Sequence, residues 1–344
     1  MILGLGVFAS KFLVFLMMPL YTGILSPGEY NLADLISQAA NLIMPLACIG
    51  ITDGVFRFTL DGEKNRRSVL TSGLAVLLCV GALFALLSPL ISFIEYFSSY
   101  SLLIAAYVIS ANLHSLLAQY VRACNRTKLF AIQGILNTLL VIGLNVLLLV
   151  VFKLGVIGYV LSVVISDFLI SVFLLIFGGV MKDVDLREIK KETIVSLIKY
   201  SVPMIPATIF WWITSVSDRY MVTFMRSEIE SGLDTAAYKI PTMLALVSNV
   251  FIEAWQYSAV SEKEGREKFF SKVFEYYQSI IFVASGAMIA LSEIFIIVLC
   301  ADNYFEAWRY IPVLTLSSVF SGFTAFFGSI YLVKKKSVLT FIHR

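Results

Sequence analysis

The feature that most constrains this chain is a series of long apolar stretches separated by short polar ones. A membrane-spanning helix needs about 20 mostly apolar residues. By that measure the chain holds about ten spans, centred near residues 12, 42, 80, 110, 140, 168, 211, 246, 287 and 320. Of the 344 residues 59% are hydrophobic and only 14% are charged, whereas about a quarter of an ordinary soluble domain is charged. We therefore predict an all-α polytopic membrane protein.

The basic residues gather in every second connection between the predicted spans and near the end of the chain. The clusters run from Arg57 to Arg67, Arg122 to Lys128, Lys182 to Lys199, Lys263 to Lys272 and Lys334 to Arg344. Cytoplasmic loops carry the excess of lysine and arginine, so we expect both chain ends in the cytoplasm and the protein in the cytoplasmic membrane. This bias explains the basic loops without a nucleic-acid partner.

The longest polar connection, residues 181–199, predicts a cytoplasmic amphipathic linker on the membrane surface. It divides the chain into a six-helix bundle at 1–180 and four further spans at 200–344. Tyr21 and Tyr220, like the Glu-Lys steps at 63–64 and 262–263, are separated by 199 residues. This common offset favours two parallel six-helix repeats. The second bundle is then incomplete, so we expect a C-terminally truncated chain.

Motifs for covalent chemistry are missing from the sequence. It has two histidines, His114 and His343, and no phosphate loop, nucleophile motif or paired metal ligands. The predicted outer loops, such as 26–29 and 95–98, are too short to hold a catalytic domain. We expect no enzyme activity, no cofactor and no metal.

Ionisable residues within or near the predicted spans indicate a wet cavity. Charged groups at membrane depth are costly and usually face a bundle interior or water. Each residue alone is equally explained as an interhelix tie or an interfacial side chain, but together they predict an aqueous cavity. They are Lys11, Asp34, Asp53, His114, Asp167, Asp218, Arg219, Lys239 and Glu253.

The stretch WWITSVSDRYMV at 211–222 places a cation at the end of a polar helical stripe. The stripe consists of Thr208, Trp212, Ser215 and Arg219. Asp218 is rotated about 100° from Arg219 and cannot pair with it along the helix. We predict that Arg219 and Lys239 converge on an anion, with Asp218 holding one of them or carrying a proton. In the alternative, Asp218 and Lys239 simply tie two helices together. Upstream, Pro203 and Pro206 fall within one turn and predict a hinge.

With these residues in view, the chain resembles the bacterial polysaccharide flippases, the Wzx-type branch of the MATE-like exporter superfamily. The stretches that carry the resemblance are KFLVFLMMPLYTGILSPGEYNLADL (11–35), GITDGVFRFTLDGEKNRR (50–67), YSVPMIPATIFWWITSVSDRYMV (200–222), AAYKI (236–240) and FIEAWQYSA (251–259). The resemblance implies two six-helix bundles around a central cavity. It also implies transport of an undecaprenyl-diphosphate-linked oligosaccharide to the outer leaflet, commonly coupled to an ion gradient.

Residue roles follow from this resemblance together with the physics of a diphosphate, which carries about two negative charges and needs partners inside a membrane. The residues expected to bind diphosphate and sugar are Arg219, Lys239, Lys11, Trp212 and Ser215. The candidates for ion coupling or charge pairing are Asp218, Asp34, Asp167 and Glu253. The expected partners are the lipid-linked oligosaccharide, membrane lipid and other membrane proteins of polysaccharide assembly.

Several alternatives stay open at this point. A lipid II-type flippase or another MATE-like exporter shares the same features, although a drug or cation exporter requires an anionic cavity. A polytopic polysaccharide polymerase or ligase requires a large outer loop. A truncated chain without activity is the remaining alternative.

Overall fold

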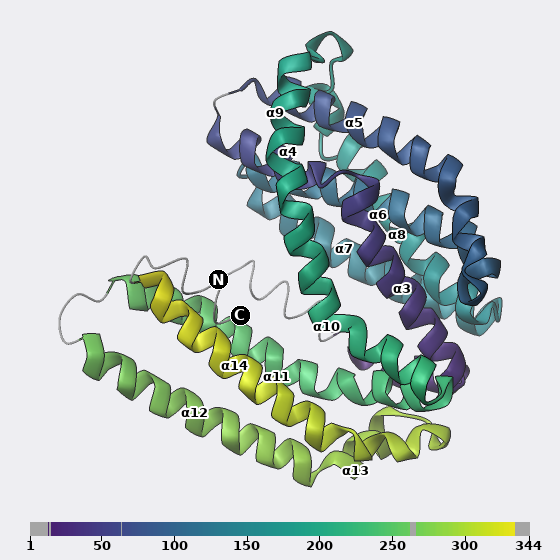
Figure 1. The fold of residues 1–344 in the computed structure, drawn as a ribbon, viewed down its shortest axis with the longest axis vertical. Coiled ribbons are helices and arrows are strands. Elements are labelled where there is room, and N and C mark those ends of the chain that lie inside the picture. Colours follow the sequence, from purple (N-terminus) through teal and green to yellow (C-terminus); the bar gives the residue numbers. More distant parts are fainter. Residues whose placement is uncertain (1–12, 14, 63, 262–265, 334–344) are drawn as a thin grey trace. The chain divides into compact units, whose positions relative to one another are not determined.

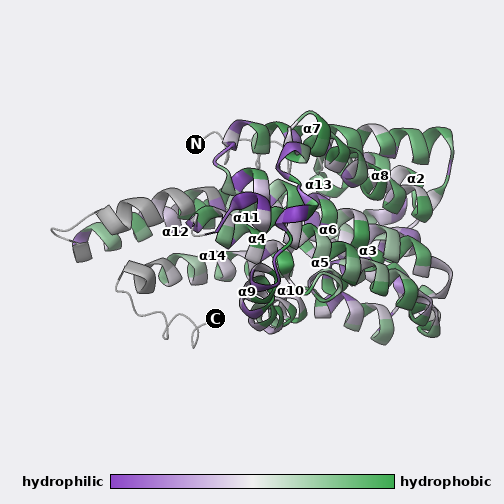
Figure 2. Ribbon diagram, turned by 90° about the horizontal axis from the view of Figure 1, so that it is seen from above, coloured by the Kyte–Doolittle hydropathy of each residue, from purple (hydrophilic) through white to green (hydrophobic). Residues whose placement is uncertain are grey.

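The computed structural model describes residue 13 and residues 15–62, 64–261 and 266–333, and over these residues it contains helices and no strand. Seven of the described helices are long and apolar enough to cross a membrane, or eight if a bent pair counts as one span. The prediction of an all-α polytopic membrane protein is confirmed. Figure 2 shows α5, α7 and α8 mostly in the green of hydrophobic residues, whereas α9 also carries purple hydrophilic ones.

The described α-helices, in chain order, are α2 (Met18–Ile24), α3 (Pro27–Ala47), α4 (Ile51–Asp61), α5 (Arg66–Leu87), α6 (Ser101–Ala123), α7 (Thr127–Asn145), α8 (Gly155–Ile176), α9 (Lys191–Ser201), α10 (Ile205–Met225), α11 (Glu228–Ser261), α12 (Arg266–Ala290), α13 (Ser292–Leu299) and α14 (Ile311–Val333). Shorter 3₁₀ or π segments join them: η1 (Ser88–Phe93), η2 (Glu95–Tyr100), η3 (Val146–Val151), η4 (Val180–Asp183), η5 (Leu186–Glu188), η6 (Val202–Met204) and η7 (Asp302–Arg309).

The predicted span centres agree with the helices wherever the structure describes them. The predicted centres from residue 80 to residue 211 and those near 287 and 320 lie in candidate spans. The predicted centre near residue 42 lies in the bent pair of helices. The centre near 246 lies in α11, which is long enough to cross but contains Asp234, Lys239 and Asn249 and is not among the seven. The centre near 12 lies outside the described residues.

The chain divides into two compact units, and the larger part of the first is Gly28–Ser231. In this unit α6 packs against α4 and α8, and α8 also packs against α7 (Figure 1). The core under α4 and α6 is formed by aliphatic side chains, including Ile51, Val55, Leu116 and Leu117, all fully buried. Close packing of this kind holds the polar side chains of these helices in fixed positions.

The predicted span near residue 42 is broken between α3 and α4, whose axes differ by 58°. Pro45 cannot donate its backbone hydrogen bond to the preceding turn. Shortly after it, Ile49 and Gly50 both have positive φ, of 53° and 61°. The Asn112 side chain of α6 donates a 3.1 Å hydrogen bond to the Met44 carbonyl just before the break.

The predicted linker is α-helical only in its second part. Residues 180–188 form the short segments η4 and η5, and α9 begins at Lys191. Helix α9 packs against α4 and α5, with the Lys64 amine donating to the Ser196 hydroxyl at 2.7 Å. Residues Lys191–Met225 form one candidate span, with η6 at the predicted proline hinge. The membrane-surface position of the linker stays a prediction.

The second unit consists of Phe15–Pro27 and Gly232–Arg344. Its core is aromatic: Trp255 of α11 stacks on Phe326 of α14 with ring centroids 5.0 Å apart, and Tyr277 of α12 is buried beside them. At the other end of α12 and α14, the Tyr304 hydroxyl donates to the Leu25 carbonyl at 2.9 Å. Helix α10 thus packs with the N-terminal helices and α2 with the C-terminal ones. The division at 180 and 200 follows the sequence repeat and stays a prediction.

Candidate functional site

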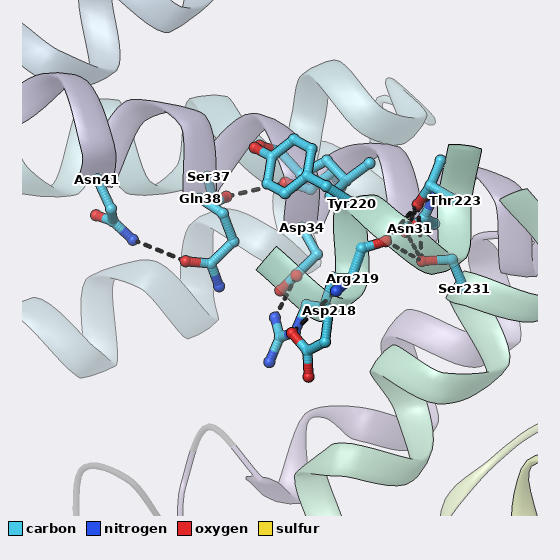
Figure 3. Close-up of polar contacts among 12 residues, drawn as sticks. Asn31, Asp34, Ser37, Gln38, Asn41, Asp218, Arg219, Tyr220, Thr223 and Ser231 are labelled. Carbon is cyan, nitrogen blue, oxygen red and sulfur yellow. Dashed lines mark hydrogen bonds and ion pairs between the residues drawn. The ribbon is translucent and has the colours of Figure 1, made fainter. Parts of the chain in front are cut away.

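A buried ion pair joins the guanidinium of Arg219 on α10 to the carboxylate of Asp34 on α3 (Figure 3). Each side chain is 7% exposed. Removing either charge from water costs several kcal/mol, and a cation at membrane depth requires a partner. Asp34 therefore makes the burial of Arg219 possible, and the pair holds α3 and α10 together.

A ring of hydrogen bonds lies one turn beyond the ion pair. The Ser231 hydroxyl at the start of α11 donates to the Asn31 side-chain oxygen at 2.8 Å, and Thr223 donates to Ser231 at 2.8 Å. The Asn31 amide completes the ring by donating to Thr223 at 3.2 Å. All three side chains are buried. Sequence reasoning missed them, although Asn31 lies three residues before Asp34 and Thr223 four after Arg219, on the same helical faces.

The aromatic residues of α10 are also anchored to α3. The Trp212 indole donates to the Gln38 carbonyl at 2.9 Å, and the Tyr220 hydroxyl donates to the Leu35 carbonyl at 3.0 Å. Their ring centroids lie 5.6 Å apart. Trp212 therefore has its polar atom satisfied by protein, and its ring remains half-buried. Ser215, between Trp212 and Arg219 on the predicted stripe, is half-buried as well.

Asp218, the residue before Arg219 on α10, is exposed. Its carboxylate accepts a 2.9 Å hydrogen bond from the Arg219 backbone amide (Figure 3). This agrees with the helical geometry, which forbids a side-chain pair between adjacent residues. The role predicted for Asp218 in holding a cation or carrying a proton stays a prediction.

Asp167 lies in a second buried polar cluster, separate from the Arg219 pair. Its carboxylate contacts His114 of α6 at 2.8 Å and Asn137 of α7 at 3.2 Å. Sequence reasoning singled out His114 and Asp167 individually but not as a pair. Gln133 and Asn137, four residues apart on one face of α7, were the available signal for a third polar helix.

The described structure does not place the other predicted residues relative to these clusters. Lys239 is half-buried in the second unit, so its convergence with Arg219 stays a prediction. Lys11 and the side chain of Glu253 lie outside what the structure describes. Over the described ranges no three histidine, cysteine or acidic side chains are grouped as metal ligands.

Comparison with known proteins decides the family. The sequence profile described as "Polysaccharide biosynthesis protein" matches residues 1–256, about three quarters of the chain. The chain belongs to this family. No curated protein matches the chain.

The fold of this polysaccharide biosynthesis family member is shared with solved MATE transporters. An inward-facing multidrug resistance MATE transporter of the MOP superfamily aligns with a TM-score of 0.70 at 16% identity, covering 96% of this chain and 83% of its own. An outward-facing form gives 0.64 at 16% identity, covering 98% and 83%. A MOP superfamily transporter from Pyrococcus furiosus, whose binding pocket is described as having reversed polarity, gives 0.64 at 15%, covering 98% and 84%. The protein is a multi-pass membrane protein that shares the fold of these transporters.

Proposed function

We propose that this transporter is a flippase for undecaprenyl-diphosphate-linked oligosaccharides. It moves the repeat unit from the cytoplasmic to the outer leaflet of a bacterial cytoplasmic membrane, with its own N-terminus in the cytoplasm. The observation that carries the proposal is the buried guanidinium of Arg219, held by Asp34 in a member of a polysaccharide biosynthesis family. An arginine is suited to this substrate because its planar donors match phosphate oxygens in pairs.

The ion pair suggests how the substrate is exchanged. In the empty protein the Asp34 carboxylate neutralises Arg219. In the loaded protein the diphosphate takes its place, so that the cation stays paired in both states. Asp34 then loses the guanidinium, and its buried negative charge is offset by uptake of a cation or proton. Substrate binding and ion uptake are linked through this one carboxylate.

The remaining predicted residues complete the proposal. Lys239 and Lys11 supply further positive charge for the diphosphate, whereas Trp212 and Ser215 contact the sugars. The alternative carriers of the coupling ion are Asp218, Asp167 and Glu253. Partner proteins are other membrane components of polysaccharide assembly.

The proposal is tested with Arg219→Ala and Lys239→Ala in a bacterial host that lacks its own flippase. Loss of a charge-assisted phosphate contact costs about 1.5–3 kcal/mol of binding free energy. Because roughly 1.4 kcal/mol corresponds to a tenfold change in an equilibrium constant, we expect surface polysaccharide to fall at least tenfold. Membrane insertion, followed by immunoblotting of membrane fractions, stays close to the wild-type level.

Arg309→Ala is the matched control, because Arg309 forms an exposed pair with Glu306, 66% and 53% exposed. It removes a cation of the same kind without touching the proposed site, so polysaccharide is retained. Normal polysaccharide in both Arg219→Ala and Lys239→Ala contradicts the anion site.

A further inference from the structure

The polar cluster around Asp167 takes no part in the proposed substrate site at Arg219. We propose that His114 and Asp167 form a proton-binding site inside the first unit, and that a proton gradient acts on transport through it. Only the second statement, that a proton gradient acts on transport, rests on the proposed function. The site combines a titratable ring, a carboxylate and two amides from α6, α7 and α8.

Both ring nitrogens of His114 have a partner. Nδ1 lies 2.8 Å from the Asp167 carboxylate, and Nε2 lies 2.7 Å from the side-chain oxygen of Gln133. The side chains of His114 and Asp167 are 15% and 9% exposed. Both ring nitrogens thus face an oxygen atom, an arrangement that favours a ring protonated on each nitrogen.

The surroundings also accommodate the ring after it loses one proton. When the Gln133 amide turns over, its NH₂ group donates to Nε2, and the neutral ring still donates from Nδ1 to Asp167. The Asn137 amide is oriented by Ser166, whose hydroxyl donates to the Asn137 side-chain oxygen at 2.5 Å, and it donates to Asp167 at 3.2 Å. One proton can therefore be exchanged at Nε2 while both ring nitrogens keep a hydrogen-bond partner. A histidine in this setting is suited to reversible protonation.

The described charges around the pair leave Asp167 as the direct partner of His114. Helix α7 faces the pair with the uncharged Gln133 and Asn137. The charged residues of α4 and those at the starts of α5 and α7 are exposed and turned to the surface: Asp53, Arg57, Asp61, Arg66, Arg67 and Lys128. From α6 itself, Arg122 is exposed, and the uncharged Tyr107 lies two turns before His114.

The helix that carries His114 also packs on the helix that carries Asp34. Tyr107 of α6 packs against a hydrophobic core that contains Ala33, Leu35 and Ile36 of α3. Proton uptake changes the charge of the His114–Asp167 pair by one unit, in surroundings where charges interact strongly. We expect the protonation state of His114 to act on the carboxylate that holds Arg219 through this charge and the packing of α6 on α3.

The proton site is tested directly by nitrogen-15 NMR of the full chain in lipid bilayers. The sequence contains two histidines, so a His343→Gln background with labelled histidine leaves His114 as the single reporting ring. The spectrum distinguishes the imidazolium from the neutral ring. We expect one to convert into the other between about pH 5 and about pH 9.

Asp167→Asn in the same background tests the pairing. Loss of the adjacent carboxylate is expected to lower the imidazolium population of His114 near neutral pH at least fivefold, on the order of what a charged neighbour provides. Asp61→Asn, which removes a carboxylate from an exposed pair with Arg57, leaves the population unchanged. A ring that keeps one protonation state throughout, or a population unaffected by Asp167→Asn, overturns the proposal.

The coupling is tested in proteoliposomes that contain lipid-linked oligosaccharide. In the wild-type protein, we expect flipping to be about tenfold faster with a pH gradient of about one unit than without it. In His114→Asn the ratio of these two rates falls to about one. An unchanged ratio in His114→Asn overturns the coupling. A wild-type protein that titrates at His114 but moves no oligosaccharide supports the proton site and contradicts the proposed function instead.

Discussion

At the scale of single residues, the burial of Arg219 depends on the carboxylate of Asp34. Breaking such a pair from one side leaves an uncompensated charge and costs about 3–5 kcal/mol. An exposed pair such as Glu306 and Arg309 contributes about 1 kcal/mol or less. A measurement of stability therefore distinguishes the buried pair from the exposed one. A measurement of transport distinguishes a purely structural role of Arg219 from a role in binding.

The discriminating variants are Asp34→Arg, Arg219→Asp and the two combined. We expect each single variant to lower the melting temperature of the detergent-solubilised protein, with the double variant recovering most of the loss. Transport stays absent in the double variant, because the cation now lies on α3 instead of α10. Glu306→Gln serves as the stability control.

Wild-type transport by the double variant contradicts the proposed role of Arg219 in binding. In that case the pair acts only as a tie between α3 and α10.

The residue pattern predicted Arg219 and the polar stripe of α10 but not the partner of the arginine. Spacing along one helix reports which residues share a face, whereas Asp34 lies 185 positions away. The same limit separated His114 from Asp167, whose side chains meet only after α6 and α8 pack. Both pairs consist of residues that the sequence marked individually as costly in a membrane.

At the scale of elements, the break between α3 and α4 depends on backbone conformations that few side chains tolerate. Gly50 has φ of 61°, and an added Cβ would lie 3.2 Å from the Ser201 carbonyl oxygen. The left-handed conformation costs a residue with a Cβ about 1–2 kcal/mol. The bend is therefore maintained by the glycine and by its contact with the end of α9.

We predict that Gly50→Ala destabilises the protein by about 1–2 kcal/mol. Gly81→Ala is the matched control, because Gly81 lies within α5 with no atom within 4 Å of an added Cβ. In a helix interior that change stabilises by about 0.5–1 kcal/mol. Chemical denaturation in detergent measures both variants, and equal stability of the two argues against a strained break at residue 50.

The helices themselves were predictable from apolar run length, because a span needs its backbone bonds satisfied internally. The break at residues 48–50 was not, since Pro45 alone is compatible with a gentle kink. The conformation of Ile49 depends on the packing of α3 on α6 and of α4 on α6 and α9. The grouping of α10 with the N-terminal helices likewise follows from side-chain packing and not from the order of the chain.

At the scale of the whole molecule, the protein combines a MATE-type fold with membership of a polysaccharide biosynthesis family. The two classes of substrate differ in charge. A cationic drug favours carboxylates in its site, whereas a lipid diphosphate favours arginine and lysine. We therefore expect a preference for the lipid diphosphate, with Arg219 as the residue that changes partner.

The most direct test of the flippase proposal is flipping by the purified protein in proteoliposomes. Fluorescent undecaprenyl-diphosphate oligosaccharide is supplied, and its exposure on the opposite leaflet is followed with a membrane-impermeant quencher. We predict flipping at least about tenfold faster than with Arg219→Ala, as the loss of a charged phosphate contact implies, and no transport of a cationic dye. Dye transport without movement of the lipid-linked oligosaccharide would contradict the proposal.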